Sequence, residues 1–380
     1  MPSEALLRSV RSTLASASSG DPTLADIAAT VTALAPVRGH AELARVAEWV
    51  HGRLLGLGPL QVIADRPGVT DVLVGGDGRV WLDGVHGLQD SGQMLGSEAE
   101  RRTLAVRLLA LGGRRLDDAQ PFGDVVLGRY RVHAAIPPVS VNGTSLSIRV
   151  LGTARASLDE LFPEPGTLWR AWLQHAVDLR LNILISGGTG AGKTTLLAAL
   201  LASCPATERL VIVEDAHELE PRHPHAIALQ ARQPNAEGRG EVGLGELVRQ
   251  ALRMRPDRLV VGECRGAEVR DMMMAMNTGH DGAAGTVHAN SVADVPARLI
   301  ALGALAGWDS RTTAMHAAAA FDLVVHVART PSGRGPVAMA RLLLDGEELR
   351  AQVIARADAS GDPTTQAGFD WFASTQGRRQ

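Results

Sequence analysis

The chain has 380 residues, of which 45% are hydrophobic and 21% charged, and its formal net charge is −3. These totals describe a globular protein with enough chain for two or three domains. They give no general attraction to nucleic acid or anionic lipid. Cys204 and Cys264 cannot supply a four-thiolate zinc site, and they argue against a disulfide framework. No apolar run of about 18 residues predicts a membrane-spanning helix, and no export signal is visible. We therefore expect a cytosolic protein that meets a membrane only through partners.

Residues 1–56 are expected to form a helical N-terminal extension, because apolar residues recur there at helical spacing. Residues 57–151 follow as an α+β domain, in which short alternating runs predict strands and residues 97–111 predict a helix. Residues 152–166 contain glycines and prolines that suit a hinge linker. The strands of this domain are expected at residues 69–74, 79–82, 129–136 and 145–150.

Residues 167–356 alternate between helical patterns and short apolar strands, which predicts an α/β domain with a parallel sheet and crossover helices. Residues 357–380 are polar and contain Gly, Asp and Pro, so we expect a flexible tail. The strands are expected at residues 181–185, 211–213, 259–261, 321–327 and 337–344, and a helix at 243–253.

The stretch LNILISGGTGAGKTTLLAALL, residues 181–201, contains the strongest motif. Gly187, Gly192, Lys193 and Thr194 fit G-x-x-x-x-G-K-[ST], in which backbone N–H groups surround a polyphosphate. Lys193 is expected to reach the β and γ phosphates of ATP, and the Thr194 hydroxyl to ligate Mg²⁺. A chance glycine-rich turn is the alternative, but strand, loop and helix follow in the order that the motif needs. The predicted nucleotide-binding residues are Gly187, Gly188, Thr189, Gly190, Ala191, Gly192, Lys193, Thr194 and Thr195.

Lys193 is the one lysine of a chain that holds 38 lysines and arginines in total. The sequence uses arginine at every other cationic position. A planar guanidinium cannot replace a compact ammonium inside a phosphate cradle. The position of this lysine therefore supports a phosphate-binding role.

Acidic residues follow two of the predicted strands, where open α/β sheets bind ligands. Glu214 and Asp215 end the first, and we expect them to polarise the attacking water or hold Mg²⁺; a helix-capping role for Asp215 is the alternative. Glu263 ends the second strand and is predicted to act in hydrolysis and to hold Mg²⁺ partly through water. Gly262 stands where a metal-binding aspartate is usual. An ordinary strand that ends in a solvated carboxylate is the alternative there.

Two histidines bracket the last of the predicted site segments, TGHDGAAGTVHAN. We expect His288 to sense the γ-phosphate and His280 to support the same loop. A two-histidine metal site is one alternative, although no Cys or Glu completes the set. A packing or capping role for one histidine is another.

Four arginines are candidates for stabilising the charge of a transferring phosphoryl group. Arg253 and Arg255 precede the strand of Glu263, and Arg131 and Arg149 lie on strands of the preceding domain. Ordinary surface ion pairs are the alternative, because arginine is abundant throughout.

The segments GGTGAGKTT, VEDAHEL, LRMRPDRLVVGECRG and NTGHDGAAGTVHAN occur in this order. They resemble the Walker A, Asp box, Walker B and His box of secretion and pilus-assembly ATPases. The resemblance covers residues 57–345 and is strongest to tight-adherence (Flp-pilus) ATPases of the CpaF or TadA kind, which are also described as conjugal-transfer-associated. The four-cysteine zinc insert of type II secretion relatives is absent from the sequence.

The resemblance implies a RecA-like P-loop motor domain behind a PAS-like N-terminal domain. It also implies a homohexameric ring with ATP and Mg²⁺ bound between the two domains. Glu214 and Glu263 would serve hydrolysis, and Arg131 and Arg149 would approach the phosphates. The partner would be an inner-membrane platform protein of a pilus or secretion machine, met at the cytoplasmic face of the membrane. The run VTDVLVGG departs from the family's more usual VTEIMVNG-like pattern.

Two other functions compete with this one. A nucleic-acid motor could use the same core, but 3% aromatic residues and a negative net charge offer no evident track for single strands, so no nucleic acid is expected. A catalytically silent ATP-binding scaffold is the other alternative, and the presence of Lys193, Thr194, Glu214 and Glu263 argues against it.

Overall fold

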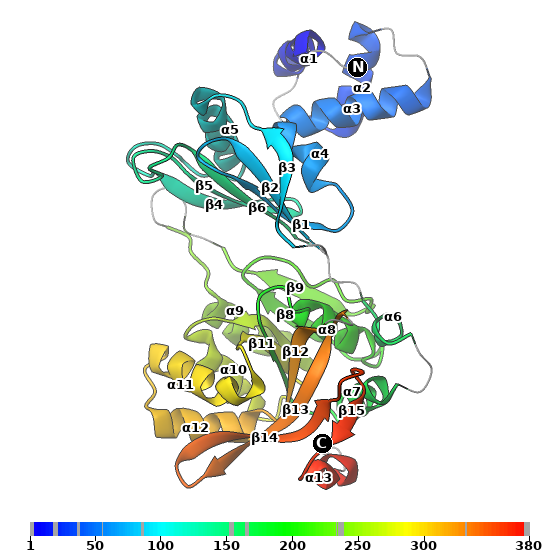
Figure 1. The fold of residues 1–380 in the computed structure, drawn as a ribbon, viewed down its shortest axis with the longest axis vertical. Coiled ribbons are helices and arrows are strands. Elements are labelled where there is room, and N and C mark those ends of the chain that lie inside the picture. Colours follow the sequence, from blue (N-terminus) through cyan, green and yellow to red (C-terminus); the bar gives the residue numbers. More distant parts are fainter. Residues whose placement is uncertain are drawn as a thin grey trace. The chain divides into compact units, whose positions relative to one another are not determined.

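A computed structural model describes residues 4–17, 22–35, 39–54, 56–84, 87–151, 156–163, 167–232, 234, 239–330 and 333–375. The chain divides into two compact units, residues 1–152 and 153–380, and each unit is described by itself (Figure 1). Among the described residues, no helix has both the length and the apolar character needed to cross a membrane.

Unit 1 begins with three helices, as the spacing of apolar residues predicts. Their inward faces share a small core that includes Val10, Ile27, Val31 and Val50. Thr23 caps the second helix, with Asp26 closing a capping box. The helices are α1 (Glu4–Ala17), α2 (Leu24–Leu34) and α3 (His40–Leu54).

The rest of unit 1 is a six-stranded antiparallel sheet in the order β3-β2-β1-β6-β5-β4. Successive side chains of each strand point to opposite faces of this sheet: Val132 and Ile148 are buried on one face, whereas Arg131 and Arg149 point to the other. The predicted strands and helix are confirmed, and β3 and β4 are additional edge strands. The elements are η1 (Gly58–Leu60), α4 (Gln61–Ala64), β1 (Val69–Val74), β2 (Arg79–Gly84), β3 (Gln89–Met94), α5 (Glu98–Leu111), β4 (Phe122–Leu127), β5 (Tyr130–Ala135) and β6 (Ser145–Val150).

Unit 2 is built on a nine-stranded sheet in the order β15-β14-β13-β12-β7-β11-β10-β8-β9. Strands β12 to β9 in this order pair in parallel, and β13, β14 and β15 continue the sheet antiparallel. The predicted parallel sheet is thus confirmed. The strands are β7 (Ile183–Gly187), β8 (Leu210–Glu214), β9 (Ala226–Gln230), β10 (Arg258–Cys264), β11 (Ala284–His288), β12 (Leu323–Thr330), β13 (Gly333–Asp345), β14 (Glu348–Ala357) and β15 (Pro363–Thr365).

Helices cover both faces of this sheet (Figure 1). Successive residues of a strand point to opposite faces, so Leu184 packs toward one helical layer while Ile183 and Ile185 pack toward the other. The central strands β7 and β8 are therefore buried along their whole length, as expected for a sheet covered on both sides. One layer contains α9 (Leu244–Ala251), α10 (Glu268–Met276), α11 (Val295–Leu305) and α12 (Ser310–Ala320), and the other α6 (Leu158–Leu161), α7 (Leu168–Asp178), α8 (Lys193–Ala202) and α13 (Phe369–Ser374).

The predicted hinge at 152–166 falls partly outside the described residues, which omit 152–155 and 164–166. Between them, α6 is a short helix that Ser157 and Glu160 cap at its N-terminus, and Leu158 packs into the core of unit 2. The segment thus includes a docked helix, and the linker role of 152–166 stays a prediction.

The expectation of a flexible tail is wrong for residues 357–375. β15 pairs with the end of β14, and α13 buries Phe372, which is 1% exposed. Trp169 on α7 donates a hydrogen bond from Nε1 to the Gly361 carbonyl at 2.9 Å. Phe369 of the tail packs against Trp172, with 4.5 Å between the ring centroids. Aromatic residues therefore order this segment although its composition is largely polar. Residues 376–380 lie outside the described part.

Candidate functional site

Four strands end at one edge of the parallel sheet, and the predicted polar residues gather there. Register pairing sets Gly187 beside His288, and β10 lies on the other side of β11. The phosphate loop, His288 and Glu263 therefore follow one another across the sheet, with Glu214 on the next strand, β8. The structure thus brings Lys193, His288, Glu263 and Glu214 to a common edge, as the strand-end argument predicts.

The phosphate loop runs from the end of β7 to the start of α8. A Cβ on Gly187 would lie 2.4 Å from the Val327 carbonyl oxygen, so only glycine fits there. Gly190 and Gly192 have φ angles of +68° and +100°, which other residues adopt only with strain. These backbone features fit the wrapped loop that the motif predicts.

Lys193 begins α8, and its ammonium group turns back over the loop. Nζ donates to the carbonyl oxygens of Gly187 at 3.0 Å and Gly188 at 2.9 Å. Burial lowers the pKa of the ammonium, an effect that nearby Glu263 opposes. Thr194 and Thr195 follow in the first turn and are half-buried.

Glu263 faces the phosphate loop from β10. Its Oε1 lies 3.9 Å from Lys193 Nζ, and its Oε2 accepts a hydrogen bond from Arg265 Nε at 2.7 Å. The side chain of Glu263 is 24% exposed, so water can reach it. Arg265 lies two residues after Glu263 in the motif, but this contact was not predicted from the sequence.

Glu214 has a different environment, although it also ends a strand. The residue is 4% exposed, and its carboxylate accepts hydrogen bonds from the backbone N–H of Glu218 at 3.2 Å and of Leu219 at 3.1 Å. Burial raises the pKa of Glu214 to about 7, against the lowering effect of these hydrogen bonds. The two predicted catalytic glutamates are therefore not equivalent: Glu263 is partly exposed and pairs with Arg265, whereas Glu214 is buried, with His217 Nδ1 3.3 Å from its Oε2.

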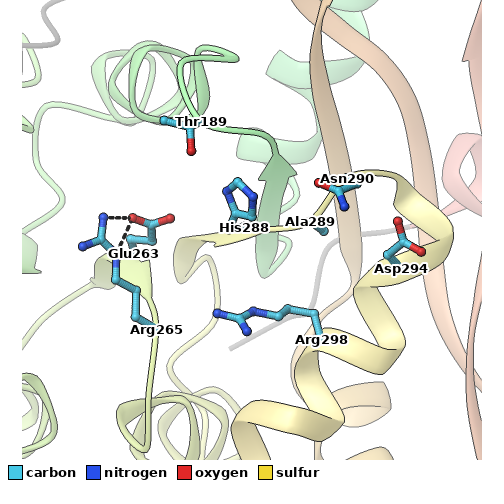
Figure 2. Close-up of a pocket in the computed structure, with 8 residues that line it drawn as sticks. All are labelled: Thr189, Glu263, Arg265, His288, Ala289, Asn290, Asp294 and Arg298. Carbon is cyan, nitrogen blue, oxygen red and sulfur yellow. Dashed lines mark hydrogen bonds and ion pairs between the residues drawn. The ribbon is translucent and has the colours of Figure 1, made fainter. Parts of the chain in front are cut away.

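A cavity of about 580 Å³ opens beside Glu263 and His288. Figure 2 shows Thr189 of the phosphate loop on one side of it and Arg298 of α11 on the other. Of the lining residues, Thr189, Glu263 and His288 were predicted from the sequence as site residues. The complete lining is Thr189, Glu263, Arg265, His288, Ala289, Asn290, Asp294 and Arg298.

Two hydrogen bonds behind the loop were also missed. Ser186, directly before the phosphate loop, bonds through Oγ to His326 Nδ1 at 2.9 Å, and Thr286 Oγ1 donates to the Gly262 carbonyl at 2.7 Å. Burial lowers the pKa of His326, which favours the neutral ring. Both bonds join neighbouring strands under the site. A short polar side chain within an apolar strand is the signal that could have indicated them.

His280 does not support the loop of His288, and that expectation is wrong. His280 precedes β11 and His288 ends it, so the length of the strand separates them. His280 Nδ1 instead bonds to the Ala275 carbonyl at the end of α10, at 3.1 Å. The capping alternative applies to His280, and the role of His288 stays a prediction.

Arg253 and Arg255 lie at the opposite edge of the sheet from the phosphate loop, because they precede β10 rather than follow it. Both are exposed, and Arg255 has a φ of +53°. Contact with the phosphates of their own subunit is therefore a wrong expectation, and contact with another subunit's site stays a prediction. Arg258 of the same motif is buried and pairs with Glu208, which is a structural role.

Arg131 and Arg149 are cross-strand partners in unit 1. Arg149 Nε donates to Asp71 Oδ1 at 3.1 Å, and Arg131 Nε lies 3.7 Å from Asp124 Oδ1. The four side chains form two ion pairs on the face of the sheet that carries its polar residues. The structure thus brings the two predicted arginines together.

Within the described ranges, no group of three or more His, Cys, Asp or Glu residues could hold a metal ion. Asp215 is exposed after β8, and Glu263 is paired with Arg265. This donor set suits Mg²⁺ held mainly by phosphate oxygens, water and a hydroxyl group, as Mg²⁺ commonly is in nucleotide sites. Thr194 in the first turn of α8 would supply the hydroxyl.

A parallel sheet that carries a phosphate loop after one strand and a glutamate facing its lysine from another defines a P-loop NTPase. The family model described as "Type II/IV secretion system protein" matches residues 117–341. The chain is 47% identical over 333 residues to a Mycobacterium tuberculosis protein named for conjugal transfer, covering 84% of this chain and 94% of that one. It is 31% identical over 283 residues to the conjugal transfer protein TrbB of Rhizobium radiobacter, covering 72% and 84%.

The fold agrees with these matches. The ATPase DotB of Yersinia pseudotuberculosis superposes with a TM-score of 0.53 at 15% identity and covers 80% of each chain. The chain belongs to the type II/IV secretion system protein family, and the resemblance to secretion ATPases is confirmed.

Proposed function

We propose that this chain is a cytoplasmic ATPase that couples ATP hydrolysis to pilus assembly or protein transport at the inner membrane. The observation that carries the proposal is the 3.9 Å approach of Glu263 Oε1 to Lys193 Nζ across the phosphate loop. A solvent-accessible carboxylate this close to the lysine supports a role for Glu263 beside the terminal phosphate of a bound nucleotide. Family membership supports the transport role.

Lys193 would exchange its present carbonyl contacts for the β and γ phosphates of ATP. The loop from Gly187 to Gly192 would direct N–H groups at the same oxygens. Bound Mg²⁺, with Thr194 as a ligand, would neutralise charge on the phosphates. Within the described part of the chain, the lysine side chain donates hydrogen bonds only to the two loop carbonyls, so nucleotide entry would break no other such bond there.

Glu263 would orient the attacking water and accept its proton as the water oxygen bonds to the γ-phosphorus and the bond to the ADP oxygen breaks. Arg265 keeps this carboxylate in place through its Nε contact. Glu214 is the second carboxylate of the proposal: its pKa of about 7 allows it to gain or lose a proton near neutral pH. His288 would lie beside the γ-phosphate from the intervening strand and respond to its presence.

The active form would be a homohexameric ring with ATP between domains. In the ring, the PAS-like domain of residues 57–151 would present Arg131 and Arg149 to the phosphates, and Arg253 and Arg255 would face a neighbouring subunit. A tight-adherence (Flp) pilus or a conjugal-transfer machine is the system we favour, with a membrane platform protein as the partner. The conjugal-transfer names of two relatives support this choice.

Phosphate release from ATP tests the function directly. The wild-type chain should release phosphate, Lys193→Ala should abolish turnover, and Lys193→Arg should be nearly as damaging, because guanidinium does not fit the cradle. Arg311→Gln, on an exposed residue of α12, is the control. A wild-type chain that binds ATP without turnover would be a silent scaffold. Turnover that depends on single-stranded DNA would indicate a nucleic-acid motor.

A further inference from the structure

The cavity beside Glu263 contains a guanidinium group that the proposed chemistry leaves unused. Nε of Arg298, in the first turn of α11, is buried and makes no hydrogen bond within the part of the chain that the structure describes. Buried polar atoms are nearly always paired, so an unpaired one indicates a missing water, ion or ligand. Arg298 is itself one of the lining residues.

Arg298 reaches into the cavity from the side opposite the phosphate loop. Figure 2 shows its guanidinium below His288 and beside Arg265, with Thr189 across the open space. A ligand that contacts Arg298 would therefore lie on the side of Glu263 and His288 that faces away from the phosphate loop. This is the space into which a phosphate group would move after leaving ADP.

The charges of the lining favour an anion at this place. Glu263 is already paired with Arg265 and lies 3.9 Å from Lys193, so it does not neutralise Arg298. Asp294 is one turn before Arg298 but forms no ion pair with it; its Oδ2 accepts from Ser291 Oγ at 2.8 Å instead. Arg298 thus faces the cavity with its charge uncompensated.

We propose that this cavity holds the inorganic phosphate product of hydrolysis and that Arg298 is its main contact. The inference rests on the proposed function and adds to it a site for the product. A tetrahedral phosphate ion offers oxygens to Nε and to a terminal nitrogen of the guanidinium together, which is the geometry that arginine binds best. His288 and Asn290 are placed to contact the remaining oxygens. Phosphate leaves through the open side of the cavity.

Titration of inorganic phosphate into the full chain, preloaded with ADP and Mg²⁺, tests the proposal by calorimetry. Arg298→Gln removes the charge and should weaken phosphate binding about tenfold or more, as expected for loss of a charge-assisted bidentate contact. Arg298→Lys keeps the charge but loses Nε, and should bind phosphate with intermediate affinity. ADP affinity should stay within about twofold of wild type in both, because Arg298 does not reach the phosphate loop. Arg311→Gln is the matched surface control.

Phosphate affinity that is unchanged in Arg298→Gln, with ADP still bound, overturns the inference and leaves the ATPase proposal intact. An equal loss of affinity for phosphate and for a non-hydrolysable ATP analogue also overturns it, since Arg298 would then contact the γ-phosphate of the nucleotide. A wild-type chain that binds no ADP contradicts the ATPase proposal itself. If Arg298→Gln does not fold, the phosphate affinity of Arg298→Lys is compared with that of the wild type instead. Added phosphate should also inhibit turnover by the wild type more strongly than turnover by Arg298→Lys, and equal inhibition would overturn the inference.

Discussion

Glu214 packs against Gly262 so closely that a Cβ on the glycine would lie 2.7 Å from Glu214 Cγ. Gly262 precedes Glu263 on β10 and occupies the place where an aspartate is usual in Walker B strands. The side chain of Glu214 fills the space that such an aspartate would need. The departure from the usual motif thus has a steric cause in this chain.

Gly262→Ala should therefore destabilise the protein by about 1–3 kcal/mol, the usual cost of overpacking a dense interior. Denaturant unfolding measures the change. Gly335→Ala, at an extended strand position with no atom within 4 Å of the added Cβ, should change stability much less. The double variant Gly262→Ala with Glu214→Ala should recover part of the loss, because the second change removes the clashing carbon. Equal stabilities of Gly262→Ala and wild type would show that Glu214 moves aside freely.

Stability should depend on pH through Glu214. Its pKa is raised from 4.5 to about 7 in the folded state, so the folded protein binds a proton more tightly than the unfolded chain. The stabilisation of the folded state that comes from the protonated Glu214 carboxyl is fully present below pH 4.5 and is lost as the pH rises through 7. A shift of this size corresponds to about 3 kcal/mol.

Glu214→Gln removes this titration. Relative to wild type, the variant should gain about 3 kcal/mol of stability between pH 5 and pH 8, measured by chemical denaturation at several pH values. Glu348→Gln changes an exposed glutamate and should show no such trend. A stability difference between Glu214→Gln and wild type that is constant with pH would mean that Glu214 stays ionised when buried.

Much of this site could be predicted from the sequence, because its parts are contiguous motifs with a fixed order. The phosphate loop needs a strand, glycines and a helix start within a few residues, and carboxyl ends of parallel strands must share an edge. Arg253 and Arg255 were misplaced because closeness in sequence to β10 was given more weight than the end of the strand they adjoin. The direction of a parallel strand already implies that residues before β10 lie at the edge of the sheet opposite the phosphate loop.

Other features depend on packing that no local pattern records. Arg298 lies ten residues after His288 and reaches the cavity from α11, and nothing in the sequence nearby distinguishes it from the many other arginines. The ordered tail was missed because polar composition was weighed above the aromatic residues Phe369, Trp371 and Phe372. The different environments of Glu214 and Glu263 arise from the loop after β8, whose N–H groups fold back over Glu214.

Activity should require subunit assembly if Arg131 or Arg149 acts on a neighbouring nucleotide. An arginine supplied in trans contributes about 10³–10⁵ in rate where it has been isolated. Arg149→Ala and Lys193→Ala should each be inactive, and mixed rings should regain activity, because some interfaces combine an intact phosphate loop with an intact arginine. ATP turnover during a titration of one variant against the other measures this.

Arg79→Ala is the control for the mixing experiment, since Arg79 is an exposed arginine of the same sheet. It should be active alone. An inactive mixture at every ratio, with mixed rings confirmed by sizing, would place Arg149 in its own subunit's site. Arg131→Ala is to be mixed in the same way, because its guanidinium lies on the strand next to Arg149.

We expect Glu263 to drive hydrolysis of an ATP held by Lys193. Single-turnover hydrolysis and ATP binding by Glu263→Gln in the full chain test it most directly. The variant keeps the shape of the side chain and removes its charge. Bound ATP should be hydrolysed about 100-fold more slowly or worse, as for loss of a principal electrostatic group, while ATP affinity stays close to that of wild type. Weakened binding with a normal rate per bound ATP would contradict the claim and make Glu263 a binding residue.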